Sequence, residues 1–187
     1  MFAVSYIAII KIIVAVLHLT VTGAWPHFGH EGPVVMLVAT LLSTPVQFGE
    51  EVGWRGYALP RLAQCIRYGP GALVLGAVWA CWHLPQFFFV AADTYKQSFP
   101  IWSLQVIALS VAMAWLYTRT HGSLLLIMLM HAAVNNTKDI VPSAAADATN
   151  AFSLHASLVM YLTAAIMWMA SAYFLFSMPK QPPLKTL

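Results

Sequence analysis

Two adjacent glutamates stand out in this chain because they close a segment apolar enough to cross a membrane. Glu50 and Glu51 are followed by Arg55, and charged residues make up only 8% of the sequence. Ionisable side chains in or near the hydrocarbon are rare, face the interior of a helix bundle and mark function. Residues four apart share a helix face, so Glu51 and Arg55 are predicted to pair. Glu50 points about 100° away from Glu51 and is expected to face a cavity.

Two histidines and an asparagine in later apolar runs supply further polar groups. His131 and Asn135 are four apart, so both side chains point to one spot, and His83 lies at a similar depth in an earlier run. A carboxylate can act as the general base that activates water, and hydrogen-bond donors can hold the developing oxyanion. The four residues Glu50, His83, His131 and Asn135 therefore fit the hydrolysis of a peptide bond.

The elements that must position these residues are membrane helices. Hydrophobic residues make up 60% of the 187 residues, whereas a soluble domain is about 45–50% apolar and about 25% charged. A membrane helix needs about 20 mostly apolar residues, and only helices or closed barrels satisfy their backbone groups in lipid. Six runs qualify, at roughly 2–22, 33–51, 70–91, 100–118, 122–138 and 151–177. We therefore expect an all-α, polytopic transmembrane helix bundle in a single domain, residues 1–187.

A segment with a different pattern, residues 53–68, lies between the second and third runs. Arg55, Arg61 and Arg67 are spaced by six and interleaved with apolar and aromatic side chains. This pattern favours a short amphipathic helix at the interface, with its arginines toward lipid headgroups, or a cytoplasmic continuation of the second helix.

The basic residues predict the orientation of the bundle. With six crossings, one side holds six of them and the other side two, Lys96 and Lys138. The larger set is Arg55, Arg61, Arg67, Arg119, Lys180 and Lys185. The positive-inside rule places both termini in the cytoplasm, and we expect a plasma-membrane protein whose site opens toward the cytoplasm. Lys11 interrupts the first run, so either its ammonium snorkels to the interface or the helix boundary lies elsewhere.

Charge and cysteine content exclude other classes. The formal net charge is +3 and no run of Lys and Arg is present, so a nucleic-acid partner is not expected. Cys65 and Cys81 lack a CxxC spacing, so neither a disulfide framework nor a thiolate metal site is supported.

Three motifs together resemble the signatures of a known family. They are Glu50-Glu51-Val52-Gly53-Trp54-Arg55-Gly56, Trp79-x-x-x-His83 and His131-x-x-x-Asn135. In order, spacing and membrane setting they look like the CAAX-protease and bacteriocin-processing (CPBP, Abi) family of intramembrane endopeptidases, which includes the type II CAAX prenyl endopeptidases. The resemblance covers about residues 33–136. Trp79 departs from it, because the family usually has phenylalanine there. Members also commonly have more membrane helices, which here would precede Met1.

The resemblance implies roles for the residues that match. Glu50 and His83 would activate water, His131 and Asn135 would form the oxyanion hole, and Glu51 with Arg55 would support Glu50. The enzyme would be an endopeptidase acting on a protein or peptide at the membrane, in CAAX-type processing or in bacteriocin maturation and immunity. The glutamate mechanism requires no cofactor. In a metal-dependent version, a metalloendopeptidase, the ligands of a divalent ion would be Glu50, His83 and His131, although the HExxH spacing of zinc proteases is absent.

The residues alone leave other interpretations open. The chain could be a non-catalytic immunity or scaffolding protein of the membrane that keeps the motifs for packing. It could also be a small proton-coupled transporter with Glu50 and His83 as a proton relay. Transporters often carry inverted repeats, and none is visible, so this ranks last. At the level of residues, Glu50 could belong to a structural ion network, His83 to a packed core, and Asn135 or Asn136 to an interhelical hydrogen bond.

Overall fold

Every element of the described structure is helical. The computed structural model describes residues 1–143 and 150–179. The α-helices are α1 (Phe2–Thr22), α2 (Pro33–Ser43), α3 (Phe48–Glu51), α4 (Leu59–Ile66), α5 (Tyr68–His83), α6 (Phe99–Arg119), α7 (Leu124–Thr137) and α8 (Leu158–Ser177). Three short 3-10 helices are η1 (Thr44–Gln47), η3 (Leu84–Phe88) and η4 (Lys138–Ile140), and η2 (Val52–Ala58) is a π-helix. The predicted all-α fold is confirmed.

Five helical segments of the described chain are long and apolar enough to cross a membrane. They are Phe2–Thr22, Pro33–Ile66, Tyr68–Phe88, Phe99–Arg119 and Leu158–Ser177. The sixth predicted run, 122–138, becomes α7, which has 14 residues. At about 1.5 Å per residue it rises about 21 Å, which is shorter than the hydrocarbon core of about 30 Å. The chain is an integral membrane protein, with α7 as a shorter helix packed against α1 and α2.

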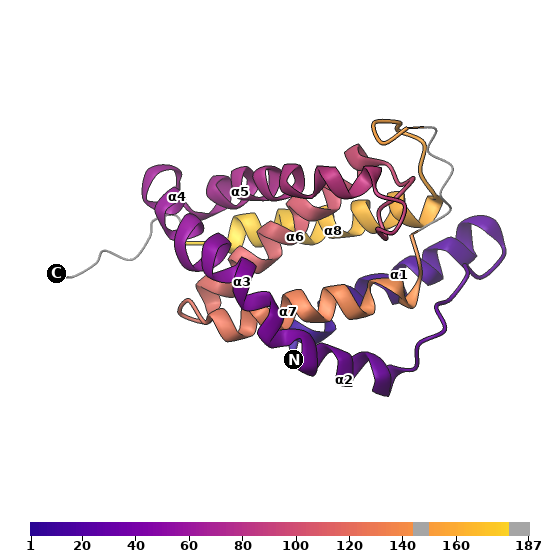
Figure 1. The fold of residues 1–187 in the computed structure, drawn as a ribbon, viewed down its shortest axis with the longest axis horizontal. Coiled ribbons are helices and arrows are strands. Elements are labelled where there is room, and N and C mark those ends of the chain that lie inside the picture. Colours follow the sequence, from indigo (N-terminus) through magenta and orange to yellow (C-terminus); the bar gives the residue numbers. More distant parts are fainter. Residues whose placement is uncertain (144–149, 180–187) are drawn as a thin grey trace.

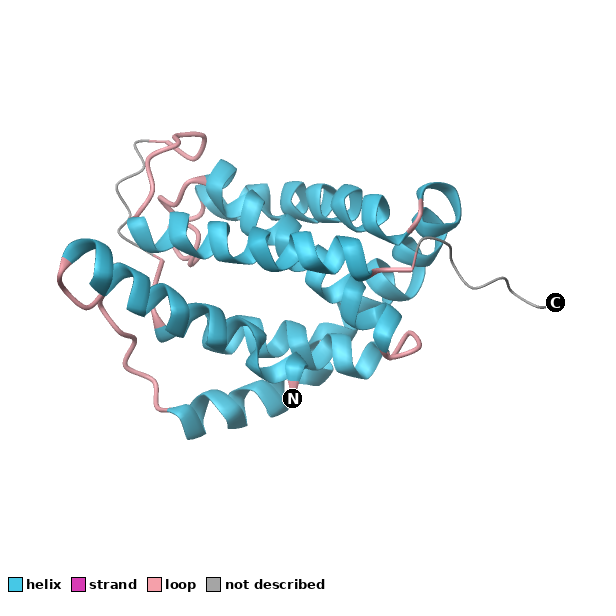
Figure 2. Cartoon of the chain, turned by 180° about the vertical axis from the view of Figure 1, so that it is seen from behind, coloured by secondary structure: helices cyan, strands magenta, loops and turns pink. Residues whose placement is uncertain are grey.

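The helices form two layers (Figure 1). Helices α5, α6 and α8 pack side by side in one layer, and α1, α7 and α2 make up the other. The layers also touch through α1 with α8 and α6 with α7. The view from behind shows the same separation between the two sets of helices (Figure 2). A cavity between such layers can be lined from both sides.

Small residues allow α5 and α6 to approach each other closely. A Cβ atom on Gly76 would lie 2.8 Å from the Cα of Ile107 and 2.8 Å from the Cβ of Ser110. The Ser110 hydroxyl donates a hydrogen bond to the Ala72 carbonyl oxygen at 2.9 Å. Small residues that let two backbones approach are the usual means of packing helices in membranes, and here they fix α5, which carries His83.

The first motif lies on a helical segment whose winding changes repeatedly. From Pro33 to Ile66 the chain passes through α2, η1, α3, η2 and α4. Pro45 lies in the first turn of η1 and Pro60 in the first turn of α4, where the missing N–H is tolerated. π-Helical turns inside α-helices are frequent at functional sites. Here the π-helical turn η2 directly follows Glu50 and Glu51.

The amphipathic segment is shorter than predicted, and Arg55 is not part of its polar face. Only α4, Leu59–Ile66, is amphipathic, with Leu59 and Ala63 buried and Arg61 exposed. The Arg61 guanidinium lies 3.5 Å from the centroid of the Tyr57 ring. Arg55 is fully buried, so the prediction that it faces the headgroups is wrong. Its position in the π-helix directs it toward the bundle interior, where Glu51 pairs with it.

Candidate active site

Glu50 and Glu51 have different surroundings although they are neighbours. Glu51 is 0% exposed, and its carboxylate accepts two hydrogen bonds from Arg55 Nη1, at 2.9 Å to Oε1 and 3.1 Å to Oε2. Its Oε1 is also 2.7 Å from His131 Nδ1. Glu50 is half-buried and lines a cavity. The two carboxylates therefore have the geometry that the helical spacing predicts, one paired and one facing a cavity.

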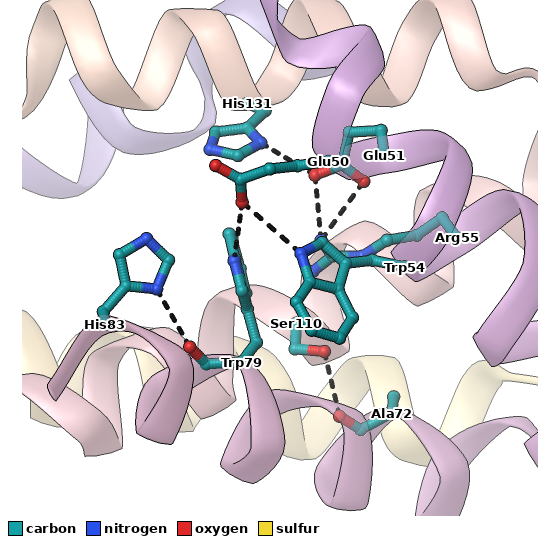
Figure 3. A network of polar contacts seen from close by, with 9 residues as sticks. All are labelled: Glu50, Glu51, Trp54, Arg55, Ala72, Trp79, His83, Ser110 and His131. Atoms are coloured by element: carbon teal, nitrogen blue, oxygen red, sulfur yellow. Dashed lines mark hydrogen bonds and ion pairs between the residues drawn. The ribbon is translucent and has the colours of Figure 1, made fainter.

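Two indole groups hold the Glu50 carboxylate. Trp79 Nε1 donates to Oε2 at 3.0 Å, and Trp54 Nε1 donates to the same oxygen at 3.4 Å. Figure 3 shows the carboxylate between these rings and His131. Within the described residues Oε1 has no hydrogen-bond partner in the protein. One oxygen of Glu50 is therefore fixed, and the other is free to bind a ligand from the cavity.

His83 ends α5 and presents one ring nitrogen to the cavity. Its Nδ1 lies 2.9 Å from the carbonyl oxygen of Trp79, one turn earlier in the same helix. A carbonyl oxygen can only accept, so Nδ1 carries the proton and, in the neutral ring, Nε2 carries the lone pair. The ring packs between Trp79 and Trp102, with centroids 5.8 Å and 5.4 Å away. The site thus contains an oriented imidazole with a basic nitrogen.

His131 is buried and its ring is held by Glu51. The Glu51 carboxylate accepts from Arg55, and it also accepts the Nδ1–H of His131. The ring packs edge-to-face against Trp79, with centroids 5.3 Å apart. Because Nδ1 donates, Nε2 donates only when the ring is doubly protonated.

The structure separates the two neighbouring asparagines. Asn135 is exposed and lines the cavity, as does His131 one turn earlier. Asn136 Nδ2 donates to Ser43 Oγ at 2.9 Å and to the Ala132 carbonyl oxygen at 2.7 Å. The interhelical hydrogen bond that was an open interpretation for either residue is therefore made by Asn136.

One cavity connects the predicted site residues. It has a volume of about 990 Å³, and Glu50, His83, His131 and Asn135 all line it. The loops after η3 and α7 contribute Asp93 and other exposed residues, at the end of the bundle opposite to α4 (Figure 1). The lining includes none of Arg55, Arg61 and Arg67. This disagrees with the expectation that the site opens toward the end rich in arginine.

Trp79 occupies a central position in the site that the sequence did not predict. This residue donates to Glu50, accepts from His83 through its carbonyl, and contacts His131. The Arg55 guanidinium lies 4.3 Å from the centroid of its ring, close enough for a cation–π interaction. The chain has Trp79 where the resembling family usually has phenylalanine, which has no N–H to donate. This difference from the family pattern was the feature of the sequence that could have indicated the hydrogen bond to Glu50.

Neither of the two explanations predicted for Lys11 is correct. Helix α1 runs without interruption from Phe2 to Thr22, so the boundary was placed correctly. The side chain is 2% exposed, so the ammonium does not snorkel to the interface. It lines the same cavity as Glu50.

The arrangement of donors does not fit a compact metal centre. Within residues 1–143 and 150–179, no three side chains of His, Cys, Asp or Glu are grouped so that they could hold a metal ion. The metal set Glu50, His83 and His131 is therefore not supported as a centre, and no step below passes through a metal.

Comparisons with known proteins agree with the motif pattern. Residues 30–137 match a family model described as "Type II CAAX prenyl endopeptidase Rce1-like". The chain is also 26% identical over 100 residues to "CAAX prenyl protease 2" of Methanococcus maripaludis. That match covers 49% of this chain and 36% of the relative, so this chain spans only about a third of that protein's length. The family match confirms the resemblance that the three motifs predict.

Proposed function

Because the chain belongs to the Rce1-like type II CAAX prenyl endopeptidase family, we propose that it is an intramembrane endopeptidase. It hydrolyses a peptide bond in a protein or peptide presented at the membrane. The observation that carries this proposal is the position of Glu50, which lines one cavity together with His83, His131 and Asn135.

Glu50 and His83 activate water in this mechanism. The free Oε1 of Glu50 accepts a hydrogen bond from one O–H group of the water. The Nε2 lone pair of neutral His83 accepts a hydrogen bond from the other O–H group. As the water oxygen attacks the carbonyl carbon of the scissile bond, Glu50 takes up a proton. It then gives this proton to the leaving amine, so that the carboxylate is regenerated. General catalysis of this kind contributes about 10²–10⁴-fold to the rate.

His131 and Asn135 stabilise the oxyanion that forms during the attack. The Asn135 amide donates without changing its protonation state, and His131 donates from Nε2 when its ring is doubly protonated. Donors fixed in place before the reaction lower the barrier because they need no reorganisation when the charge develops.

Glu51 connects Arg55 and His131 in the buried part of the site, at 2.9 Å and 2.7 Å from its Oε1. Buried charges are tolerated when they are paired and hydrogen-bonded. Glu51 and Arg55 thereby support the site without touching the substrate.

The family match and the name of the relative support a proposal for the substrate class. CAAX-type processing removes a short peptide after a prenylated cysteine near the chain terminus, and the name of the relative from Methanococcus maripaludis favours this class over bacteriocin maturation. The partners are then a prenylated protein or peptide and the bilayer. We retain a plasma-membrane location. With α7 as the sixth crossing, the count of basic residues predicts that both termini are cytoplasmic. Labelling of single cysteines placed at Lys96 and Arg61 from either side of sealed cells tests this orientation.

Substitution of Glu50 by glutamine tests the function. The purified protein in detergent or nanodiscs is incubated with a fluorogenic peptide that contains an S-farnesylated cysteine followed by three residues. We expect cleavage by the unmodified chain and a loss of at least about 10²-fold in the variant. If folded Glu50→Gln protein still cleaves the peptide, Glu50 is not the general base of the reaction. If the folded, unmodified protein does not cleave the peptide, the chain is a scaffold or immunity protein instead. Proton-coupled uptake without cleavage would favour a transporter.

A further inference from the structure

Lys11 places a buried positive charge in the wall of the cavity. Its Nζ donates to the Val141 carbonyl oxygen at 2.9 Å and to Ser143 Oγ at 3.0 Å. Both acceptors are neutral, and an ammonium has three N–H donors. Among the described residues, no carboxylate lies within 4.0 Å of this nitrogen. Asp93 at the same end of the cavity is paired with Lys138, and Asp139 acts on Lys11 only at longer range.

A buried hydroxyl without a hydrogen-bond partner lines the same cavity. The Thr94 side chain is 7% exposed, and its Oγ1 has no hydrogen-bond partner within the described part of the chain. A buried hydroxyl without a partner destabilises the protein by roughly 1–3 kcal/mol, and a buried charge needs a counter-charge. A cation and a hydroxyl that line one cavity indicate a ligand with an anionic oxygen.

We propose that Lys11, assisted by Thr94, binds the C-terminal carboxylate of the substrate peptide. This rests on the proposed endopeptidase function. Glu50 and Lys11 line one cavity of about 990 Å³, and three extended residues reach about 10 Å. A carboxylate held at Lys11 would therefore fix how far the scissile bond lies from the chain end. Lys11 precedes the segment 30–137 that matches the family, so it adds a determinant of specificity that the matched motifs do not contain.

A pair of substrates separates this role from a structural one. The farnesylated peptide is made with a free C-terminal carboxylate and with a carboxamide. We expect the unmodified protein to cleave the acid with a kcat/KM at least about tenfold higher than the amide, as for a charge-assisted hydrogen bond. Lys11→Met keeps a long side chain without the charge and should lower kcat/KM for the acid only, so that the difference disappears. Thr94→Val should reduce the difference to a smaller extent.

Ser143→Ala is the matched control. It removes a contact of Lys11 but leaves the ammonium, and the acid-to-amide ratio should remain as in the unmodified protein. Equal cleavage of acid and amide by the unmodified protein would overturn the inference. So would an equal loss for both substrates in Lys11→Met, because Lys11 would then only hold residues 141–143. A third peptide ends in a glutamate whose terminal carboxyl group is an amide. If this peptide is cleaved as well as the free acid, Lys11 binds a side-chain carboxylate and not the chain terminus.

Binding of the product tests Lys11 separately from catalysis. The free tripeptide and its amide are titrated calorimetrically into the Glu50→Gln protein. We expect the acid to bind at least about tenfold more tightly and this preference to be lost in the double variant with Lys11→Met. Absence of any cleavage by the unmodified protein would reject the proposed function, whereas equal binding of acid and amide would reject the role of Lys11.

Discussion

The indole nitrogen of Trp79 donates a hydrogen bond to Oε2 of Glu50 at 3.0 Å. The two residues come from different helical segments, α5 and α3, so this contact links the wall of the cavity to its carboxylate. The same ring stacks under Arg55 and meets His131 edge-to-face. Trp79 therefore sets the position of Glu50 in relation to the other site residues.

Trp79→Phe tests this positioning role. The variant keeps an aromatic ring in the buried position but removes the donor, and a hydrogen bond to a charged group is worth about 1.5–3 kcal/mol. We expect kcat to fall roughly tenfold or more with little change in KM. Steady-state kinetics with the farnesylated peptide provide the measurement.

Trp102→Phe is the comparison for that variant. Trp102 lines the same cavity, and its indole nitrogen makes no hydrogen bond within the described residues. Its kcat should remain close to that of the unmodified protein. If both variants lose kcat equally, the volume of the ring matters and the Glu50 contact does not.

The sequence could predict contacts within a helix but not those between helices. The Glu51–Arg55 pair followed from a spacing of four residues, and it is present. The contact of Glu51 with His131 spans 80 positions, and helical spacing cannot tell which helix faces another. Lys11 shows the same limit, because α1 is apolar on all sides and its sequence does not reveal which face is buried.

Helix lengths and winding were also only partly predictable. Apolar runs located the long helices, since a span requires about 20 such residues. Helix α7 begins after Gly122, which has a positive φ, and ends at Thr137, after two asparagines. It is therefore shorter than a full membrane span. The π-helix η2 leaves no signal in an apolar run, so the inward direction of Arg55 could not be foreseen.

Neutral variants of the two glutamates should separate catalysis from stability. Glu51→Gln leaves the fully buried Arg55 without a counter-charge, which typically destabilises a protein by about 3–5 kcal/mol. Glu50→Gln keeps a half-buried side chain of the same shape and should alter the free energy of unfolding by less than about 1 kcal/mol. Thermal unfolding in detergent, followed by circular dichroism, measures both. Equal unfolding temperatures of the two variants would contradict the division of roles.

The pair of Asp93 and Lys138 should give a small, acid-sensitive contribution to stability. The hydrogen bond from Lys138, and then its charge, hold the pKa of Asp93 below its usual value. An acid whose pKa is lower in the folded state stabilises the protein above its unfolded pKa of about 3.9, and this contribution is lost as the pH falls through the folded value. Because the Asp93 side chain is 77% exposed, the contribution should be below about 1 kcal/mol.

Lys138→Met checks this pH dependence. The variant should be less stable than the unmodified protein above about pH 4, and the two proteins should be equally stable at lower pH. Unfolding temperatures measured between neutral and acidic pH give the comparison. A constant difference at every pH would show that Lys138 contributes by packing and not through its charge.

The neighbouring asparagines of α7 offer a paired test of the oxyanion site. Asn135 lines the cavity, whereas Asn136 bonds Ser43 of α2. Removing one oxyanion donor costs about 10²–10³-fold in kcat, so Asn135→Ala should lose activity at unchanged stability. Asn136→Ala should keep kcat and lose about 0.6 kcal/mol, the mean for an interhelical hydrogen bond in a membrane protein. If kcat falls in Asn136→Ala and not in Asn135→Ala, the oxyanion donor is Asn136 and not Asn135.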